Sequence, residues 1–159
     1  MKKNRIIIAI TGASGAIYGI RILEELKEVG VETHLVISKS AQLTILQETD
    51  FKIPDIQKVA DFTYPVNDIG AAISSGSFKS MGMIIAPCSI KTMSEIATGV
   101  TSNLISRAAD VILKERKKLV LMVRETPLHL GHLRTMANLT EMGAIVAPLC
   151  QLFILTLKI

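Results

Sequence analysis

The sequence has few of the residues that mark several classes of protein. It contains two cysteines and no tryptophan in 159 residues, and only 4% of its residues are aromatic. Two cysteines cannot build a disulfide framework, so we expect a reducing compartment, with the cytoplasm as the default location. The two cysteines also lack the spacing of metal ligands, and no metal site is expected.

Long apolar runs and clustered positive charge are missing as well. No uninterrupted apolar segment approaches the roughly 18 residues of a membrane span, so no membrane partner is expected. The net charge is +4, but the lysines and arginines are dispersed, which argues against nucleic-acid binding and favours an anion site. The chain is 49% hydrophobic, which suffices for one globular domain with a substantial core.

Apolar runs alternate with helical patterns along the chain. Strands are predicted over Ile6–Thr11, Thr33–Ser38, Met81–Ala86, Leu119–Val123 and Ala144–Ala147. Helices are predicted near Ala16–Val29, Ser40–Gln47, Thr92–Ala97, Leu104–Lys117 and Leu130–Met142. This alternation predicts an α/β protein with a doubly wound parallel sheet in three layers, of flavodoxin or Rossmann type. The segment Phe51–Ser80 is predicted to be a long, irregular connection that contains a weak strand.

The first predicted strand leads into a turn of small residues, Gly12 to Gly15, which opens directly into a helix. Glycines let the backbone approach an anion, Ser14 adds a hydroxyl, and the first N–H groups of the helix point toward the ligand. We therefore predict a phosphorylated cofactor here, the alternative being a tight turn without a ligand. The spacing is that of neither a dinucleotide fingerprint nor a nucleotide P-loop. Ser38 stands where a dinucleotide site would carry Asp or Glu, which favours FMN over NAD.

Further polar residues follow the later predicted strands. In the segment Pro87–Thr92, Ser89 is expected to cap a helix whose first turn could bind a flavin edge or an anion. Arg124 and Glu125 directly follow a buried strand, where a charged pair is costly unless a ligand or partner matches it. The segment Ser38–Ser40 follows the second predicted strand. Because the carboxyl ends of parallel strands share one edge of a sheet, this segment, the glycine turn and the residues after the two later strands are predicted to meet there.

Other residues have two interpretations each. Arg107 and Lys114 are seven residues apart on one predicted helix, so their cations face either a phosphate or solvent from nearly the same side. His129 and His132 could share a helix face, but no third metal ligand is evident. Cys88 is interpreted as a buried small hydrophobic residue rather than a nucleophile, since no histidine lies near it in sequence.

Five motifs in order resemble the flavin prenyltransferase family, the UbiX-type flavoproteins formerly described as aromatic acid or phenolic acid decarboxylase subunits. The motifs are Thr11–Ala16, Ile37–Lys39, Pro87–Thr92, Arg107–Arg116 and Arg124–Leu128, and the resemblance runs from Arg5 to about Pro148. It implies an enzyme that binds reduced FMN and dimethylallyl phosphate, joins the prenyl group to flavin N5 and C6, and releases prenylated FMN. It also implies a functional link to a UbiD-type decarboxylase, and a large homo-oligomer with FMN at subunit contacts.

The resemblance also assigns roles to matching positions. It assigns FMN binding to Gly12, Ala13, Ser14, Ser38, Ser89, Ile90, Lys91, Thr92 and Arg124. It assigns the substrate phosphate to Arg107 and Lys114, and catalytic roles to Ser14, Glu48 and Glu125. Fixed cations would stabilise the negative charge that develops on the leaving phosphate, and a carboxylate would assist removal of the ring proton. This chemistry requires no metal.

The resemblance ends near the C-terminus. We expect residues 1–148 to form an FMN-binding flavoprotein domain and residues 149–159 to form an atypical tail. At this point the family has a proline-rich segment, with a Tyr and a later Arg that help bind the prenyl phosphate. Deleting one nucleotide from codons for Pro-Pro-Val-Pro-Ala-Phe-Tyr gives the residues found from Pro148 to Ile154, so a frameshift is one hypothesis and a genuine short variant the other. The alternatives to the transferase are an FMN-binding protein that is inactive without the usual C-terminal segment, and an FMN-dependent decarboxylase.

Overall fold

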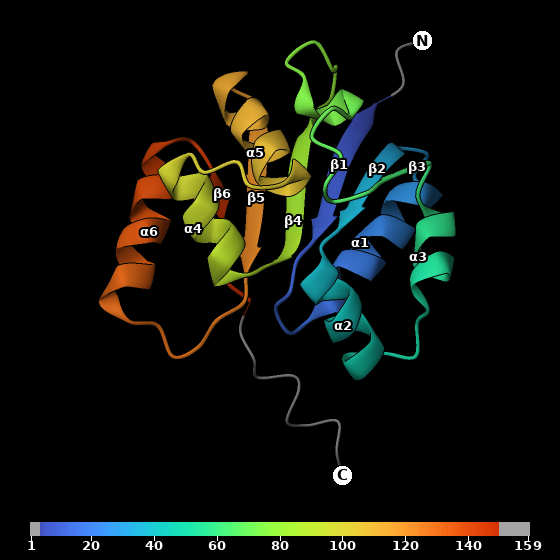
Figure 1. Cartoon of the computed structure of the whole chain (residues 1–159), viewed down its shortest axis with the longest axis horizontal. Coiled ribbons are helices and arrows are strands. Elements are labelled where there is room, and N and C mark those ends of the chain that lie inside the picture. The colour runs from blue at the N-terminus through green and yellow to red at the C-terminus, as the bar shows by residue number, and fades with distance from the viewer. Residues whose placement is uncertain (1–3, 150–159) are drawn as a thin grey trace.

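The structure, a computed structural model, describes residues 4–149. Within this range six parallel strands form one sheet in the order β3-β2-β1-β4-β5-β6 (Figure 1). The strands are β1 (Arg5–Ile10), β2 (Glu32–Ile37), β3 (Phe62–Tyr64), β4 (Gly82–Cys88), β5 (Lys118–Val123) and β6 (Ile145–Val146). The strand order changes direction between β1 and β4, which is the mark of a doubly wound sheet.

Helices cover both faces of this sheet. They are α1 (Ala16–Glu28), α2 (Lys39–Glu48), α3 (Ile53–Val59), α4 (Ile90–Thr98), α5 (Leu104–Lys114) and α6 (Leu130–Glu141), with one short 3₁₀ turn, η1 (Ala72–Ser74). In Figure 1 the helices α1 to α3 lie to one side and α4 to α6 to the other. The predicted three-layer α/β architecture is therefore confirmed.

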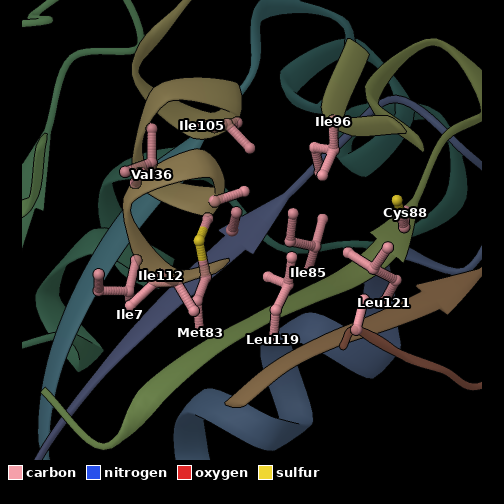
Figure 2. Packing of buried hydrophobic residues seen from close by; sticks show 14 of the residues in the cluster. Ile7, Val36, Met83, Ile85, Cys88, Ile96, Ile105, Ile112, Leu119 and Leu121 are labelled. Carbon is pink, nitrogen blue, oxygen red and sulfur yellow. The ribbon is translucent and has the colours of Figure 1, made fainter. Parts of the chain in front are cut away.

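Successive residues of each strand feed two separate cores. Ile8 and Ile10 of β1 pack with apolar residues of α1, α2 and α3, whereas Ile7 and Ala9 pack with apolar residues of α4, α5 and α6. Figure 2 shows the second core, in which side chains of β1, β4 and β5 meet those of α4 and α5. Burial on both faces explains why the strands read as continuous apolar runs rather than as alternating patterns.

The segment Phe51–Ser80 differs most from the prediction, because it contains the helix α3 as well as the weak strand, which is β3. The helix α3 is short, with a proline in its first turn, and Ile56 is its only buried residue. The helix predicted to reach Lys117 ends at Lys114, and the chain turns at Arg116, where φ is 54°. The other predicted elements are present, with shifted ends.

After β6 the chain continues alongside β5. The backbone N–H of Ala147 donates to Leu121 O at 2.8 Å, and that of Leu149 donates to Val123 O at 2.8 Å. The tail beyond residue 149, with the frameshift hypothesis attached to it, lies outside the described residues. Between residues 4 and 149 none of the helices has the length and apolar character needed to cross a bilayer.

Candidate functional site

A pocket of about 500 Å³ lies at the carboxyl edge of the sheet, at the change of strand order between β1 and β4. Residues that follow four different strands line it: Gly12, Ala13, Ser14, Ser40, Ser89, Ile90, Lys91, Arg124 and Glu125. The convergence predicted from the sequence is therefore observed for the glycine turn, the segment after β2 at Ser40, the Ser89 turn and the Arg124–Glu125 pair. A doubly wound sheet commonly binds its ligand at this position.

The turn after β1 requires glycine because the start of α2 lies against it. A Cβ atom on Gly12 would lie 2.3 Å from Ser40 Oγ and 2.5 Å from Ser40 Cβ. Gly15 caps α1 with φ at 95°, a left-handed conformation that glycine adopts without strain. The two glycines thus let the backbone itself form one wall of the pocket.

Glu48 supports the same turn from the C-terminal end of α2. The backbone N–H of Gly15 donates to Glu48 Oε2 at 2.9 Å, which places a carboxylate at the N-terminus of α1. This arrangement is favourable because the N-terminal end of a helix carries partial positive charge. Glu48 is not among the residues that line the pocket, so its observed contact is with the backbone of the turn.

The turn after β4 forms the opposite wall and begins α4. Ser89 Oγ accepts from the Thr92 N–H at 3.3 Å and donates to Thr92 Oγ1 at 3.2 Å, which confirms the predicted helix cap. The side chain of Lys91 is 80% exposed, and its Nζ lies 3.8 Å from Glu95 Oε1. Exposed ion pairs of this kind contribute little to stability, so the Lys91 cation is able to turn toward an anion in the pocket.

Arg124 and Glu125 complete the lining directly after β5. The Arg124 N–H donates to Cys88 O at 3.2 Å, which ties the end of β5 to the end of β4. The lining residues include two cations, Lys91 and Arg124, and one carboxylate, Glu125. The N-terminus of α4 adds partial positive charge. Backbone N–H groups, hydroxyls and a net positive charge suit an anionic, phosphorylated ligand.

Two serines at the start of α2 have different positions relative to the pocket. Ser38 Oγ accepts from the Ala41 N–H at 3.1 Å and so caps α2, and it lies 3.1 Å from Ser40 Oγ. Ser40 lies in the segment expected at this edge but has no predicted binding role, and it lines the pocket in place of Ser38. Two signals in the sequence point to Ser40: it follows the second strand, and it stands two residues after a capping serine, on the first turn of the helix.

Arg107 and Lys114 are not among the residues that line this pocket. Arg107 forms an ion pair with Asp110 at 3.0 Å, and Lys114 bonds with its neighbour Glu115, which lowers the pKa of that carboxyl. Lys114 also helps to line a second cavity of about 500 Å³, beside the ends of α5 and α6. The role of these two cations in binding a substrate phosphate stays a prediction.

Cys88 is buried, as expected of a small hydrophobic residue, and His129 and His132 lie together at the start of α6. Burial raises the pKa of the Cys88 thiol to about 12, so the thiol is neutral at physiological pH. His129 caps α6 by accepting from the Gly131 N–H at 3.0 Å, and its ring stacks on that of His132 with centroids 3.6 Å apart. Over the described range, residues 4–149, no three His, Cys, Asp or Glu side chains are grouped so as to hold a metal ion.

Known proteins resemble this chain over most of its length. A family model described as Flavoprotein matches residues 1–156. The flavin prenyltransferase UbiX of Thauera aromatica is 61% identical over 144 residues, which are 91% of this chain and 74% of that protein. The crystal structure of AnUbiX in complex with FMN and dimethylallyl pyrophosphate is 50% identical, with a TM-score of 0.92 over 92% of this chain and 78% of that one. A dodecameric FMN-dependent UbiX-like decarboxylase from Escherichia coli O157:H7 is 46% identical, with a TM-score of 0.91 over 94% of this chain and 82% of that one.

Proposed function

The chain belongs to the UbiX family of flavin prenyltransferases, and on that premise we propose that it transfers a dimethylallyl group from dimethylallyl phosphate to reduced FMN. The observation that carries the proposal is the pocket at the carboxyl edge, where the turns after four strands meet. Its volume of about 500 Å³ lies in the range of cofactor pockets, and its donors fit a phosphorylated flavin. The product, prenylated FMN, would serve a UbiD-type decarboxylase.

FMN binding is assigned to the two turns that face each other across the pocket. The turn of Gly12, Ala13 and Ser14 lines one wall, and the N-terminus of α4 at Ser89 lines the other. Both are suited to hold phosphate and ring oxygens, and Arg124 adds a planar cation that pairs well with an anionic group. When bound, reduced FMN supplies an electron-rich ring as the acceptor of the allyl group. We propose that Ser38, Ile90, Lys91 and Thr92 also bind FMN.

Proton transfer is assigned to the carboxylates next to this pocket. Glu125 lines the pocket directly. Its proposed role is to accept a proton from the bound ring. Glu48 is the second proposed proton carrier. In the structure its carboxylate accepts from the Gly15 N–H and so also supports the turn. Ser14, with an exposed hydroxyl on the pocket wall, is proposed to touch the reacting region.

The substrate phosphate is assigned to Arg107 and Lys114 of a neighbouring copy. Neither lines the pocket of its own chain, and a relative 46% identical to this chain is dodecameric. In an oligomer the α5 face of one copy would meet the pocket of the next, and its cations would stabilise the charge on the leaving phosphate. Mixing inactive Arg124→Ala and Lys114→Ala variants should then restore activity, because some mixed sites combine intact residues from both chains.

The decisive experiment is an anaerobic incubation of this chain with reduced FMN and dimethylallyl phosphate, followed by mass analysis of the released flavin. A flavin that carries one dimethylallyl group supports the proposal. FMN that binds but stays unmodified would indicate a binding protein without transferase activity. In a parallel incubation with FMN and an aromatic acid, release of carbon dioxide would indicate a decarboxylase. Arg124→Gln should reduce product formation, whereas Arg134→Gln, on the exposed part of α6, serves as the charge-matched control.

We also propose a cytoplasmic location, supported by the low cysteine content. Residues 1–148 are proposed to be the FMN-binding domain and residues 149–159 an altered tail. The frameshift hypothesis predicts that resequencing the coding DNA, alongside intact-mass analysis of the protein, reveals the family's proline-rich segment. A coding sequence that gives this tail in an active protein would refute it.

A further inference from the structure

One buried hydroxyl joins the two turns that form the walls of the pocket. Thr11 lies between β1 and the glycine turn, and it is 1% exposed. Its Oγ1–H donates to Pro87 O at 2.8 Å, and the same oxygen accepts from the Ser89 N–H at 2.8 Å. The Thr11 backbone N–H also donates to Pro87 O, at 3.2 Å. Three hydrogen bonds thus connect one residue to the end of β4 and to the turn that follows it.

These bonds begin where the paired part of the two strands ends. The register of β1 with β4 runs over Ile7–Ala9 and Met83–Ile85, so it stops before either turn begins. Beyond it, Gly12 starts one wall of the pocket, and Ser89, the cap of α4, starts the other. The Thr11 hydroxyl therefore lies at the junction from which both walls extend.

A hydroxyl is suited to this junction because it donates and accepts at once. Serine in its place would keep both bonds, whereas valine would fill nearly the same volume and keep neither. Without the hydroxyl, the Ser89 N–H would lose its acceptor at the first residue of the wall that it caps.

We propose that Thr11 is a positioning residue of the FMN site, which holds the glycine turn and the N-terminus of α4 at the separation that the cofactor requires. The inference rests on the proposed function, since FMN is the ligand whose affinity it governs. Thr11 acts through Gly12 and Ser89, which line the pocket, and is not itself among the lining residues.

The test compares Thr11→Val and Thr11→Ser with a matched control, Thr33→Val. Thr33 is also fully buried, and its hydroxyl donates to Asp61 Oδ2 at 3.1 Å and accepts from the Asp61 N–H at 3.2 Å. It lies near the start of β2, toward the edge of the sheet opposite the pocket. FMN dissociation constants would come from quenching of flavin fluorescence, and the thermal midpoint of each FMN-free variant would be measured in parallel.

Thr11→Val should raise the dissociation constant for FMN about tenfold, and Thr11→Ser should leave it within about twofold of the unaltered chain. Thr33→Val should lower the thermal midpoint but leave the FMN dissociation constant unchanged. Equal affinity in Thr11→Val and the unaltered chain would overturn the inference, as would an equal loss of affinity in Thr33→Val. If Thr11→Val does not fold, Thr11→Ala gives the same comparison. An unaltered chain that binds no FMN would overturn the proposed function and this inference together.

Discussion

Replacing Gly12 with alanine should weaken FMN binding, because the new methyl group would collide with the first turn of α2. Its carbon would lie 2.3 Å from Ser40 Oγ, 2.5 Å from Ser40 Cβ and 3.3 Å from the Ser40 carbonyl carbon. The first two distances are far below van der Waals contact, so either the glycine turn or α2 must move. Both carry residues that line the pocket. Overpacking of this kind costs about 1–3 kcal/mol, and we expect FMN affinity to fall about tenfold.

A second substitution distinguishes this collision from a general loss of stability. Ser40→Gly removes both of the closest atoms and leaves the carbonyl carbon at 3.3 Å as the nearest neighbour of the new methyl. The double variant should therefore recover most of the FMN affinity. Its free energy of unfolding should be about 1 kcal/mol lower, because the added glycine weakens the helix. Gly70→Ala is the control, because its methyl would meet only Asp68 Oδ1, at 3.6 Å.

The assay is a double-mutant cycle in the FMN dissociation constant, with thermal midpoints measured on the same proteins. We expect a coupling between Gly12→Ala and Ser40→Gly that is favourable and large relative to the effect of Ser40→Gly alone. The steric reasoning is refuted if Gly12→Ala binds FMN as tightly as the unaltered chain. It is refuted equally if the two substitutions are simply additive.

Three further outcomes follow from single contacts. Glu48→Gln should keep FMN affinity, since its amide oxygen still accepts from the Gly15 N–H, whereas Glu48→Ala should weaken FMN binding. If Glu48→Gln still forms product, Glu48 is not an essential proton carrier. Cys88 should resist alkylation at pH 8 in the folded protein, because burial raises its pKa to about 12, and peptide mapping distinguishes it from Cys150. Burial, which outweighs the opposing effect of Glu32, lowers the pKa of His34 below its ordinary value of 6.5. The unfolded chain therefore binds the proton more readily, so the urea midpoint of unfolding should fall as the pH drops below 6.5. His34→Gln should make this midpoint depend less on pH.

The parts of the site that could be predicted from sequence are those that depend on local chemistry. A glycine turn after an apolar strand and a serine before a helix have their effect within a few residues, so the Gly12 turn and the Ser89 cap were found. The rule that parallel strands end at one edge then brought them together. The sequence predicts Ser40 at the same edge but predicts no role in the site for either Ser40 or Thr11, because their importance comes from contacts across the fold. Ser40 matters through its contact with Gly12, and Thr11 through a bond to a residue 78 positions away.

Arg107 and Lys114 show where a helical spacing stops being informative. Two residues seven apart share a helix face, but the spacing does not say what that face meets. The helix α5 ends at Lys114, just before β5 starts at Lys118, whereas the pocket lies after β5 ends at Val123. Six strand residues span about 20 Å, so the end of α5 lies near the amino ends of the strands and the pocket lies at their carboxyl ends. A phosphate held by Lys114 and a flavin held beside Arg124 therefore cannot share one pocket of one chain. If both residues serve the reaction, as we propose, the active site is formed only when two copies meet.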